Sequence, residues 1–241
     1  SYNLATHQQE YTLTCTRKEA EMGRILSARV KAELEVAQDE PLQERIRIIG
    51  QRLAVVCDRQ ELRYQLTVLH DEDANAFSLP GGYVFVNDGL IQKTESDDEL
   101  AAVLAHEIAH IAARHAVKRY ETGLGVQLVQ LASLAARQGQ LTRGLGVAIH
   151  ATRLAYARDD ELEADRLGVK YLKAAGYDPT AALRTLERLR TANHAERHYL
   201  PRGVTRPHYA QTHPFVPERI RAVKEALYGV ADYVDYLNTP Q

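Results

Sequence analysis

The chain has 241 residues but only two cysteines and no tryptophan, and what is scarce excludes several classes of protein. Cys15 and Cys57 are not spaced as a Cys-x-x-Cys pair, which excludes a zinc finger and leaves room for one disulfide at most. No apolar run approaches the roughly 20 residues that span a bilayer. The net charge of −2 gives no basic excess, so we expect no nucleic-acid partner.

What is present is the composition of a globular protein, with 45% hydrophobic and 26% charged residues. That composition allows one sizeable core or two tightly packed lobes. The chain opens at Ser1 with neither an initiator methionine nor a signal peptide. We therefore expect that an export or anchor segment has been removed.

Residues 106–110 read His-Glu-Ile-Ala-His, the most informative short segment of the chain. On an α-helix, positions i and i+4 share one face, so His106 and His110 can hold a single zinc ion. Glu107 lies about 100° round the helix, beside the metal, where it can take a proton from an attacking water. Because the pattern also occurs by chance, it needs a helix, a third ligand and a substrate cleft as context.

The helix that carries this motif has a recognisable start. Ser96 is followed three positions later by Glu99, a capping-box pattern, and the first turn is acidic. Neither glycine nor proline follows before Gly123, and the residues around the motif are small or apolar. Burying two imidazoles and a carboxylate in such a helix is costly unless something binds them. This favours a metal site over a chance pattern on a core helix.

The other elements are predicted from hydrophobic periodicity and turn residues. The predicted helices cover residues 17–38, 41–57, 96–121, 124–137, 145–156, 158–175, 179–195 and 217–228, and the predicted strands cover 62–69, 75–79 and 83–86. We expect an α+β, mostly helical fold, with a small antiparallel sheet packed by the motif helix. The predicted organisation is a single domain over 1–241, with N-terminal helices at 17–57, the sheet at 62–87 and a helical region at 96–228.

The segment 123–137 is apolar and weakly charged, which leaves two interpretations open. A core helix is favoured, and a helix that contacts a membrane is the alternative. Gln127, Gln130 and Ser133 disfavour full insertion.

Hydrolytic zinc usually has three protein ligands, so a third ligand must come from elsewhere in the chain. His115 is nearest, but on a continuous helix it would lie about 180° from His106, so we expect a structural or surface histidine. Glu161 and Asp165 share one face of a later helix, where one could ligate the metal and the other could fix an imidazole. A solvated charged face explains these two carboxylates equally well. Weaker candidates, without a partner pattern, are His70 and His150.

Four ordered segments of the sequence resemble peptidase family M48. This family includes the type I CAAX prenyl proteases, heat-shock membrane proteases and periplasmic β-barrel-assembly quality-control proteases. The segments are an edge-strand motif at 75–82, a zinc helix at 106–115, a third-ligand motif at 161–165, and Thr212-His213-Pro214 with Arg219-Ile220. The resemblance covers about residues 75–228.

The resemblance implies a zincin-like fold of the gluzincin type, with one zinc ion per chain. In such a site two histidines of one helix and a glutamate of a later helix hold the metal. The implied ligands are His106, His110 and Glu161, with Glu107 as the general base and Asp165 behind the ligands.

The resemblance also implies roles around the metal. His213 would approach the zinc or stabilise the oxyanion, with Arg219 helping to hold the site, and nearby Tyr209 or His208 could replace His213 as the oxyanion donor. An extended substrate would add as a strand beside Asn75, Ala76 and Phe77.

The activity that follows is zinc-dependent endopeptidase cleavage of misfolded or unassembled envelope proteins. The expected location is the periplasm or outer membrane of a bacterium, with peripheral or lipid-anchored membrane association. The expected partners are polypeptide substrates and envelope assembly proteins. Without membrane spans in the sequence, prenyl processing is not expected. Two alternatives stay open: a chaperone-like assembly factor, and a latent protease in which His213 blocks the zinc.

Overall fold

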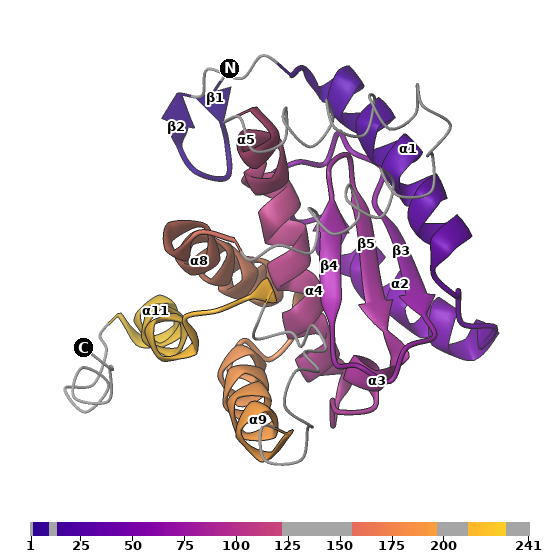
Figure 1. Cartoon of the computed structure of the whole chain (residues 1–241). Helices are drawn as coiled ribbons and strands as arrows, with labels where there is room; N and C mark the ends of the chain where they lie inside the picture. Colours follow the sequence, from indigo (N-terminus) through magenta and orange to yellow (C-terminus); the bar gives the residue numbers. More distant parts are fainter. Residues whose placement is uncertain (1, 10–13, 122–155, 197–211, 230–241) are drawn as a thin grey trace.

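The computed structural model describes residues 2–9, 14–121, 156–196 and 212–229 (Figure 1). The helices are α1 (Thr16–Glu33), α2 (Glu40–Ala54), α3 (Asp88–Ile91), α4 (Asp97–Ala112), α5 (His115–Glu121), α8 (Arg158–Ala175), α9 (Ala181–Glu196) and α11 (Val216–Tyr228). The strands are β1 (Tyr2–Asn3), β2 (Gln8–Gln9), β3 (Gln65–Leu69), β4 (Ala76–Leu79) and β5 (Tyr83–Asn87). The predicted α+β, mostly helical class is confirmed.

The three longer strands form a mixed sheet in the order β3-β5-β4. β4 and β5 are antiparallel and are joined by a tight turn in which Gly81 and Gly82 have positive φ angles. β3 instead pairs with β5 in parallel, with Leu69 opposite Asn87. The predicted all-antiparallel sheet is therefore wrong for one pair. The glycine turn fixes the β4–β5 hairpin, whereas the longer 70–75 connection carries the chain past the position of β5.

Helices cover both faces of this sheet (Figure 1). On one face, Val30 of α1 packs with Leu79, Phe77 and Phe85, and the two phenyl rings stack with their centroids 5.2 Å apart. On the other face, α2 and α4 enclose the main core with strand residues such as Val84. β4 forms one edge of the sheet and contacts α4, so the edge strand lies next to the helix that carries the histidine motif.

Helix α4 begins where the capping pattern predicts. The Ser96 side chain accepts a hydrogen bond from the backbone N–H of Glu99 at 3.2 Å. The Glu99 carboxylate accepts from the backbone N–H of Glu95 at 2.9 Å, one residue further back than in the usual capping box. From Glu99 to Ala112 every residue of α4 is buried, so the motif is presented from inside the protein.

The predicted helix 96–121 is in fact two helices. α4 ends at Ala112, Arg114 takes a left-handed conformation with φ of 60°, and α5 begins at His115. No local residue signals this break, because arginine does not favour left-handed backbone. Contacts with the N-terminal part of the chain accompany it: Arg114 donates to the carbonyl of Thr14 and lies 3.3 Å from the carboxylate of Glu19 in α1.

Helices of the C-terminal half complete the surroundings of α4, and both α8 and α9 pack directly on it. Figure 1 shows α8 and α11 on the side of α4 away from the sheet, with α8 packed on α4 and α11 on α8. The segment before α11 also reaches the edge strand, because the Thr212 hydroxyl donates to the side-chain oxygen of Asn75 at 3.2 Å. Residues from α4, α8 and the 212–219 segment are therefore brought together.

Some expectations fall outside these elements. The helices predicted at 124–137 and 145–156, apart from Tyr156, lie outside the described residues, as do His150, His208 and Tyr209. Within the described part, no helix is both long and apolar enough to cross a membrane. Cys15 and Cys57 are free thiols, the first exposed and the second buried.

Candidate metal centre

Four buried side chains converge between α4, α8 and the segment before α11. They are His106, His110, Glu161 and His213, and one ligand atom from each lies within 4.8 Å of the others. The first two are one turn apart on α4, and Glu161 lies in the first turn of α8. The 212–219 segment brings His213 from the far end of the chain, and none of the four is more than 4% exposed.

The spacing of these atoms matches the coordination sphere of zinc. At Zn–N distances of roughly 2.0–2.1 Å, tetrahedral geometry places two ligand nitrogens about 3.3 Å apart. The His106 and His110 Nε2 atoms lie 3.0 Å apart, and His213 Nδ1 lies 3.3 Å from His106 Nε2. Glu161 oxygens lie 3.4 Å from both α4 nitrogens and 3.0 Å from His213 Nδ1. The donor set and its spacing therefore fit a divalent ion such as zinc.

The charges around the cluster favour a cation. Burial raises the pKa of Glu161, but His213 and other neighbours outweigh it and hold that pKa well below its ordinary value. Burial opposes protonation of His106, yet the Asp165 and Glu161 carboxylates raise its pKa to about 9. Burial lowers the pKa of His110 well below its ordinary value, so this imidazole is neutral. Ionised carboxylates around imidazoles are what a divalent ion needs.

Asp165 and Arg219 lie behind the cluster. Asp165 Oδ1 is 2.8 Å from His106 Nδ1, the ring nitrogen that faces away from the other ligand atoms. Arg219 donates two hydrogen bonds of 2.8 Å to Asp165, lies 3.1 Å from Glu161 Oε2, and donates to the carbonyl of His213 at 3.2 Å. One buried guanidinium thus links α8 to the segment that carries His213.

Glu107 lies beside the four clustered side chains. Its carboxylate is fully buried, and neither oxygen has a hydrogen-bond partner among the described residues. His213 Nε2 lies 3.2 Å from Glu107 Oε1. An unsatisfied buried carboxylate is costly, and beside a metal site such a group has the chemistry to accept a proton.

Two side chains that the sequence did not place at the site pack against His110. His115 is 1% exposed, and its Nδ1 lies 2.8 Å from His110 Nδ1. The Tyr156 ring stacks on the His110 imidazole with centroids 3.9 Å apart. The sequence predicts that His115 is a structural or surface histidine, and its burial excludes the surface position. The helical-phase argument behind that prediction assumed a continuous helix, and the break at Arg114 removes that premise. Nothing in the sequence marked Tyr156.

The three residues predicted to bind substrate lie on and next to β4, with their side chains inward. Asn75, Ala76 and Phe77 are all at most 2% exposed. The Asn75 side-chain oxygen accepts from Ala76 N at 3.0 Å and from Thr212, so it joins the edge strand to the segment of His213. Because these exposures count backbone atoms as well, the main chain of β4 is buried along with its side chains.

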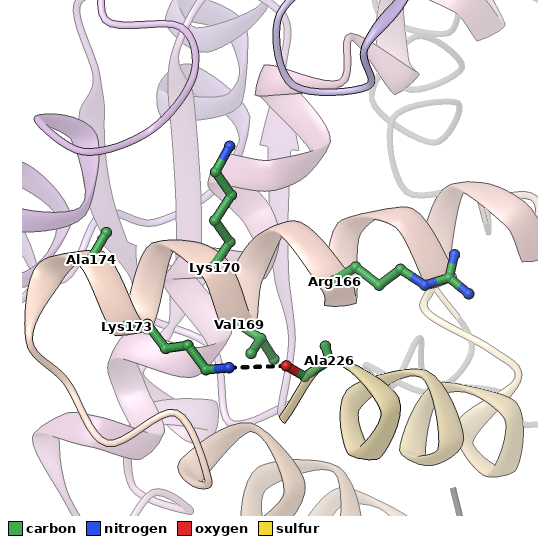
Figure 2. Close-up of a pocket in the computed structure, with 6 residues that line it drawn as sticks. All are labelled: Arg166, Val169, Lys170, Lys173, Ala174 and Ala226. Atoms are coloured by element: carbon green, nitrogen blue, oxygen red, sulfur yellow. Dashed lines mark hydrogen bonds between the residues drawn. The ribbon is translucent and has the colours of Figure 1, made fainter. Parts of the chain in front are cut away.

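A separate cavity of about 460 Å³ lies between α8 and α11 (Figure 2). It is lined by Arg166, Val169, Lys170, Lys173, Ala174 and Ala226. Figure 2 shows the Lys173 ammonium donating to the Ala226 carbonyl at 2.9 Å, and Lys170 pairs with Asp58 at 2.7 Å. Because no residue of the metal cluster lines it, this cavity is not the catalytic cleft.

Comparison with known families decides the assignment. The model described as Peptidase family M48 matches residues 40–227, which include the four clustered side chains and Glu107. The chain belongs to this family. The predicted resemblance is confirmed, and residues 40–227 form an M48 metalloendopeptidase region with a buried His-His-Glu-His metal site. The individual roles assigned to the site residues remain predictions.

The curated relatives include a mitochondrial metalloendopeptidase and proteases named for beta-barrel assembly. The mitochondrial metalloendopeptidase OMA1 of Schizosaccharomyces pombe is 35% identical over 178 residues, covering 73% of this chain and 50% of the relative. A putative beta-barrel assembly-enhancing protease of Vibrio cholerae is 32% identical over 219 residues, covering 83% and 43%. The beta-barrel assembly-enhancing protease of Escherichia coli is 27% identical over 183 residues, covering 71% and 37%. The chain thus spans about half or less of the length of these relatives.

Proposed function

We propose that this M48 chain is a zinc-dependent endopeptidase that cleaves misfolded or unassembled proteins of a bacterial envelope. Two relatives named beta-barrel assembly-enhancing proteases support the envelope setting. The two histidines and one glutamate match the ligand set of catalytic zinc in other proteases. A periplasmic or outer-membrane location, with envelope assembly proteins as partners, belongs to the same proposal, as does peripheral membrane attachment.

The observation that carries the proposal is the position of Glu107. Neither of its oxygens has a hydrogen bond among the described residues, and Oε1 lies 3.2 Å from His213 Nε2, beside a cluster whose spacing fits zinc. A purely structural metal site has no use for an extra buried carboxylate without a donor. A general base beside the metal explains both its burial and its lack of partners.

The mechanism assigns each step to a residue of this chain. When bound, zinc supplies polarisation of the scissile carbonyl and a lowered pKa for the attacking water. His106, His110 and Glu161 would hold the ion, while Asp165 would fix His106 through its Nδ1 atom. Glu107 would accept the proton of the attacking water and then pass it to the leaving amine.

The substrate is proposed to bind in an extended form along β4. Since the side chains of Asn75, Ala76 and Phe77 are buried, recognition by this strand would use main-chain hydrogen bonds, and the buried strand edge would first have to become accessible to substrate. This gives affinity for an exposed, unpaired strand without a strict sequence requirement. Such a preference suits a protease that acts on unfolded chains.

A second candidate is a latent form of the same enzyme, and the position of His213 favours it. His213 Nδ1 lies among the potential ligand atoms, and His213 Nε2 lies 3.2 Å from Glu107. In this arrangement the His213 imidazole would occupy the position at the metal that the substrate needs. It would also contact Glu107, the proposed general base. Displacement of the His213 segment would then be required before cleavage.

Replacement of Glu107 by glutamine tests the main proposal. We expect the Glu107→Gln chain to bind one zinc ion per chain and to cleave casein at least about 10²-fold more slowly, because only the general base is lost. The matched control is Glu225→Gln, an exposed glutamate on α11, which should cleave at the native rate. Zinc content by mass spectrometry and casein cleavage are the two measurements.

The same variant separates the enzyme from a chaperone-like assembly factor. A Glu107→Gln chain that still cleaves casein at the native rate would overturn the proposed mechanism. If cleavage is lost but the variant prevents aggregation of unfolded outer-membrane proteins and supports their assembly as well as the native chain, the assembly-factor alternative is correct.

A further inference from the structure

The break between α4 and α5 places a third histidine of this region behind the metal centre. On a continuous α-helix, residue 115 would lie about 140° round the axis from residue 110, and the two rings could not meet. The left-handed backbone at Arg114 turns the chain so that His115 opens α5 and returns to His110. The two Nδ1 atoms are 2.8 Å apart, and both rings are 1% exposed.

His115 has a second partner on α8. Its Nε2 lies 3.0 Å from Glu163 Oε2 and 3.6 Å from Asp160 Oδ1. Glu163 is half-buried and lies outside the cluster that includes Glu161. The result is a row of three groups, running from His110 through His115 to Glu163, that leads from the metal centre towards the surface.

Hydrogen-bonding rules fix the direction of every proton in this row. His110 Nε2 faces the other potential ligand atoms, so it must keep its lone pair free and carry its proton on Nδ1. Between two nitrogens that face each other, one must donate and one must accept, so His115 Nδ1 accepts. The His115 proton then lies on Nε2 and is donated to Glu163. By accepting from His115 Nε2, the Glu163 carboxylate fixes the tautomer of His115 and, through His115, that of His110.

The two histidines of α4 are thus supported differently. His106 has a carboxylate, Asp165, directly on its Nδ1 at 2.8 Å. His110 has the His115 imidazole there, and the Glu163 carboxylate stands one ring further away. Partners of this kind orient a metal-binding imidazole and raise its basicity.

We propose that His115 is a positioning residue that holds His110 in its metal-binding tautomer and orientation by accepting the hydrogen bond of His110 Nδ1. The inference rests on the proposed zinc site and goes beyond it. It means that His115 contributes to the metal affinity without contacting the metal.

Two substitutions of similar size separate this role from simple packing. Asparagine places an oxygen close to the position of the imidazole Nδ1, whereas leucine fills space without an acceptor. We expect His115→Leu to weaken zinc affinity by roughly 10- to 100-fold, as loss of such partners does elsewhere, and His115→Asn to recover most of it. Zinc affinity is measured by competition with a chelator, and His70→Leu, at an exposed histidine, is the control.

The outcomes are distinct. If His115→Leu binds zinc as tightly as the native chain, or if leucine and asparagine weaken binding equally, the proposal is overturned. A native-like visible spectrum of the cobalt-substituted His115→Asn protein, with a changed spectrum for leucine, supports it. Because zinc binding is measured without cleavage, a native chain that binds zinc but does not cleave casein would count against the proposed protease and not against this role of His115.

A measurement on the native zinc-loaded chain does not depend on how the variants fold. Imidazole nitrogen chemical shifts report which ring nitrogen carries the proton. We expect a protonated Nδ1 on His110, and for His115 a protonated Nε2 with an unprotonated Nδ1. A proton on Nδ1 of His115 would overturn the proposal, since that nitrogen could then not accept from His110.

Discussion

His213 faces two groups at once, and this makes it the most informative single residue for regulation. Its Nδ1 lies 3.0 Å from Glu161 Oε1, and its Nε2 lies 3.2 Å from Glu107 Oε1. A ring that stabilised only a transition state would not need to fill the resting site. This geometry is what the proposed latent form requires, and in that form the open state would be the minor population.

Replacing His213 by alanine distinguishes blocking from catalysis. If the ring blocks the site, His213→Ala should raise the hydrolysis of a short peptide by roughly tenfold or more, because minor open states are commonly about 0.1–10% populated. The initial rate with a fluorogenic peptide is the measurement. A fall of about 10²-fold would instead assign the transition-state role to His213.

At the residue scale, the sequence predicted the site as far as local geometry reaches. His106, Glu107 and His110 follow from helical spacing alone. Glu161 required the family resemblance, because paired carboxylates on a helix also describe a solvated face. His115 could not be placed, because its position depends on a left-handed arginine that no local pattern indicates.

At the element scale, the N-terminal helix α1 is connected to the metal centre although it lies outside the matched residues 40–227. Glu19 of α1 is fully buried and accepts two hydrogen bonds from Arg59, at 2.9 and 3.0 Å. It also lies 3.3 Å from Arg114, the residue of the helix break. α1 therefore helps to hold the turn that places His115.

Removing the charge of Glu19 tests this connection. Glu19→Gln leaves two buried arginines without their shared carboxylate, so we expect it to lower the free energy of unfolding by about 3 kcal/mol or more. The matched control is Glu21→Gln on the same helix, whose solvent-exposed pair with Arg24 should contribute little to the free energy of unfolding. Urea unfolding compares them, and equal losses would show that the buried network is not structural.

The elements themselves were predictable where a local signal marks their ends. Ser96 caps α4 as predicted, and the glycine turn before β5 gives the β4–β5 hairpin. The parallel pairing of β3 with β5 was not predicted. It depends on the path of the 70–75 connection past β5, which no local pattern indicates. The α4–α5 break was missed because contacts from a distant helix accompany it.

At the scale of the whole molecule, the metal centre joins segments that are far apart in sequence. α4, α8 and the 212–219 segment meet at its four buried side chains, and Arg219 is the main polar link among them without a metal. Ionised Glu161 and Asp165 lie close together there, and a divalent ion would neutralise their repulsion. Metal binding is thus expected to stabilise the packing of these segments as well as to enable catalysis.

Removal of the metal tests this stabilisation in the intact chain. With free zinc at about 1,000 times its dissociation constant, binding to the folded state alone should add about 4 kcal/mol to the free energy of unfolding. We expect the urea midpoint to fall after chelation and to recover with zinc but not with magnesium, which prefers oxygen ligands. A His106→Ala chain, which lacks one of the proposed ligands, should lose most of this response. If chelation left the native midpoint unchanged, the four side chains would not be joined by a metal ion, and Arg219, the His213–Glu161 contact and the apolar packing of α11 on α8 would have to hold the 212–219 segment.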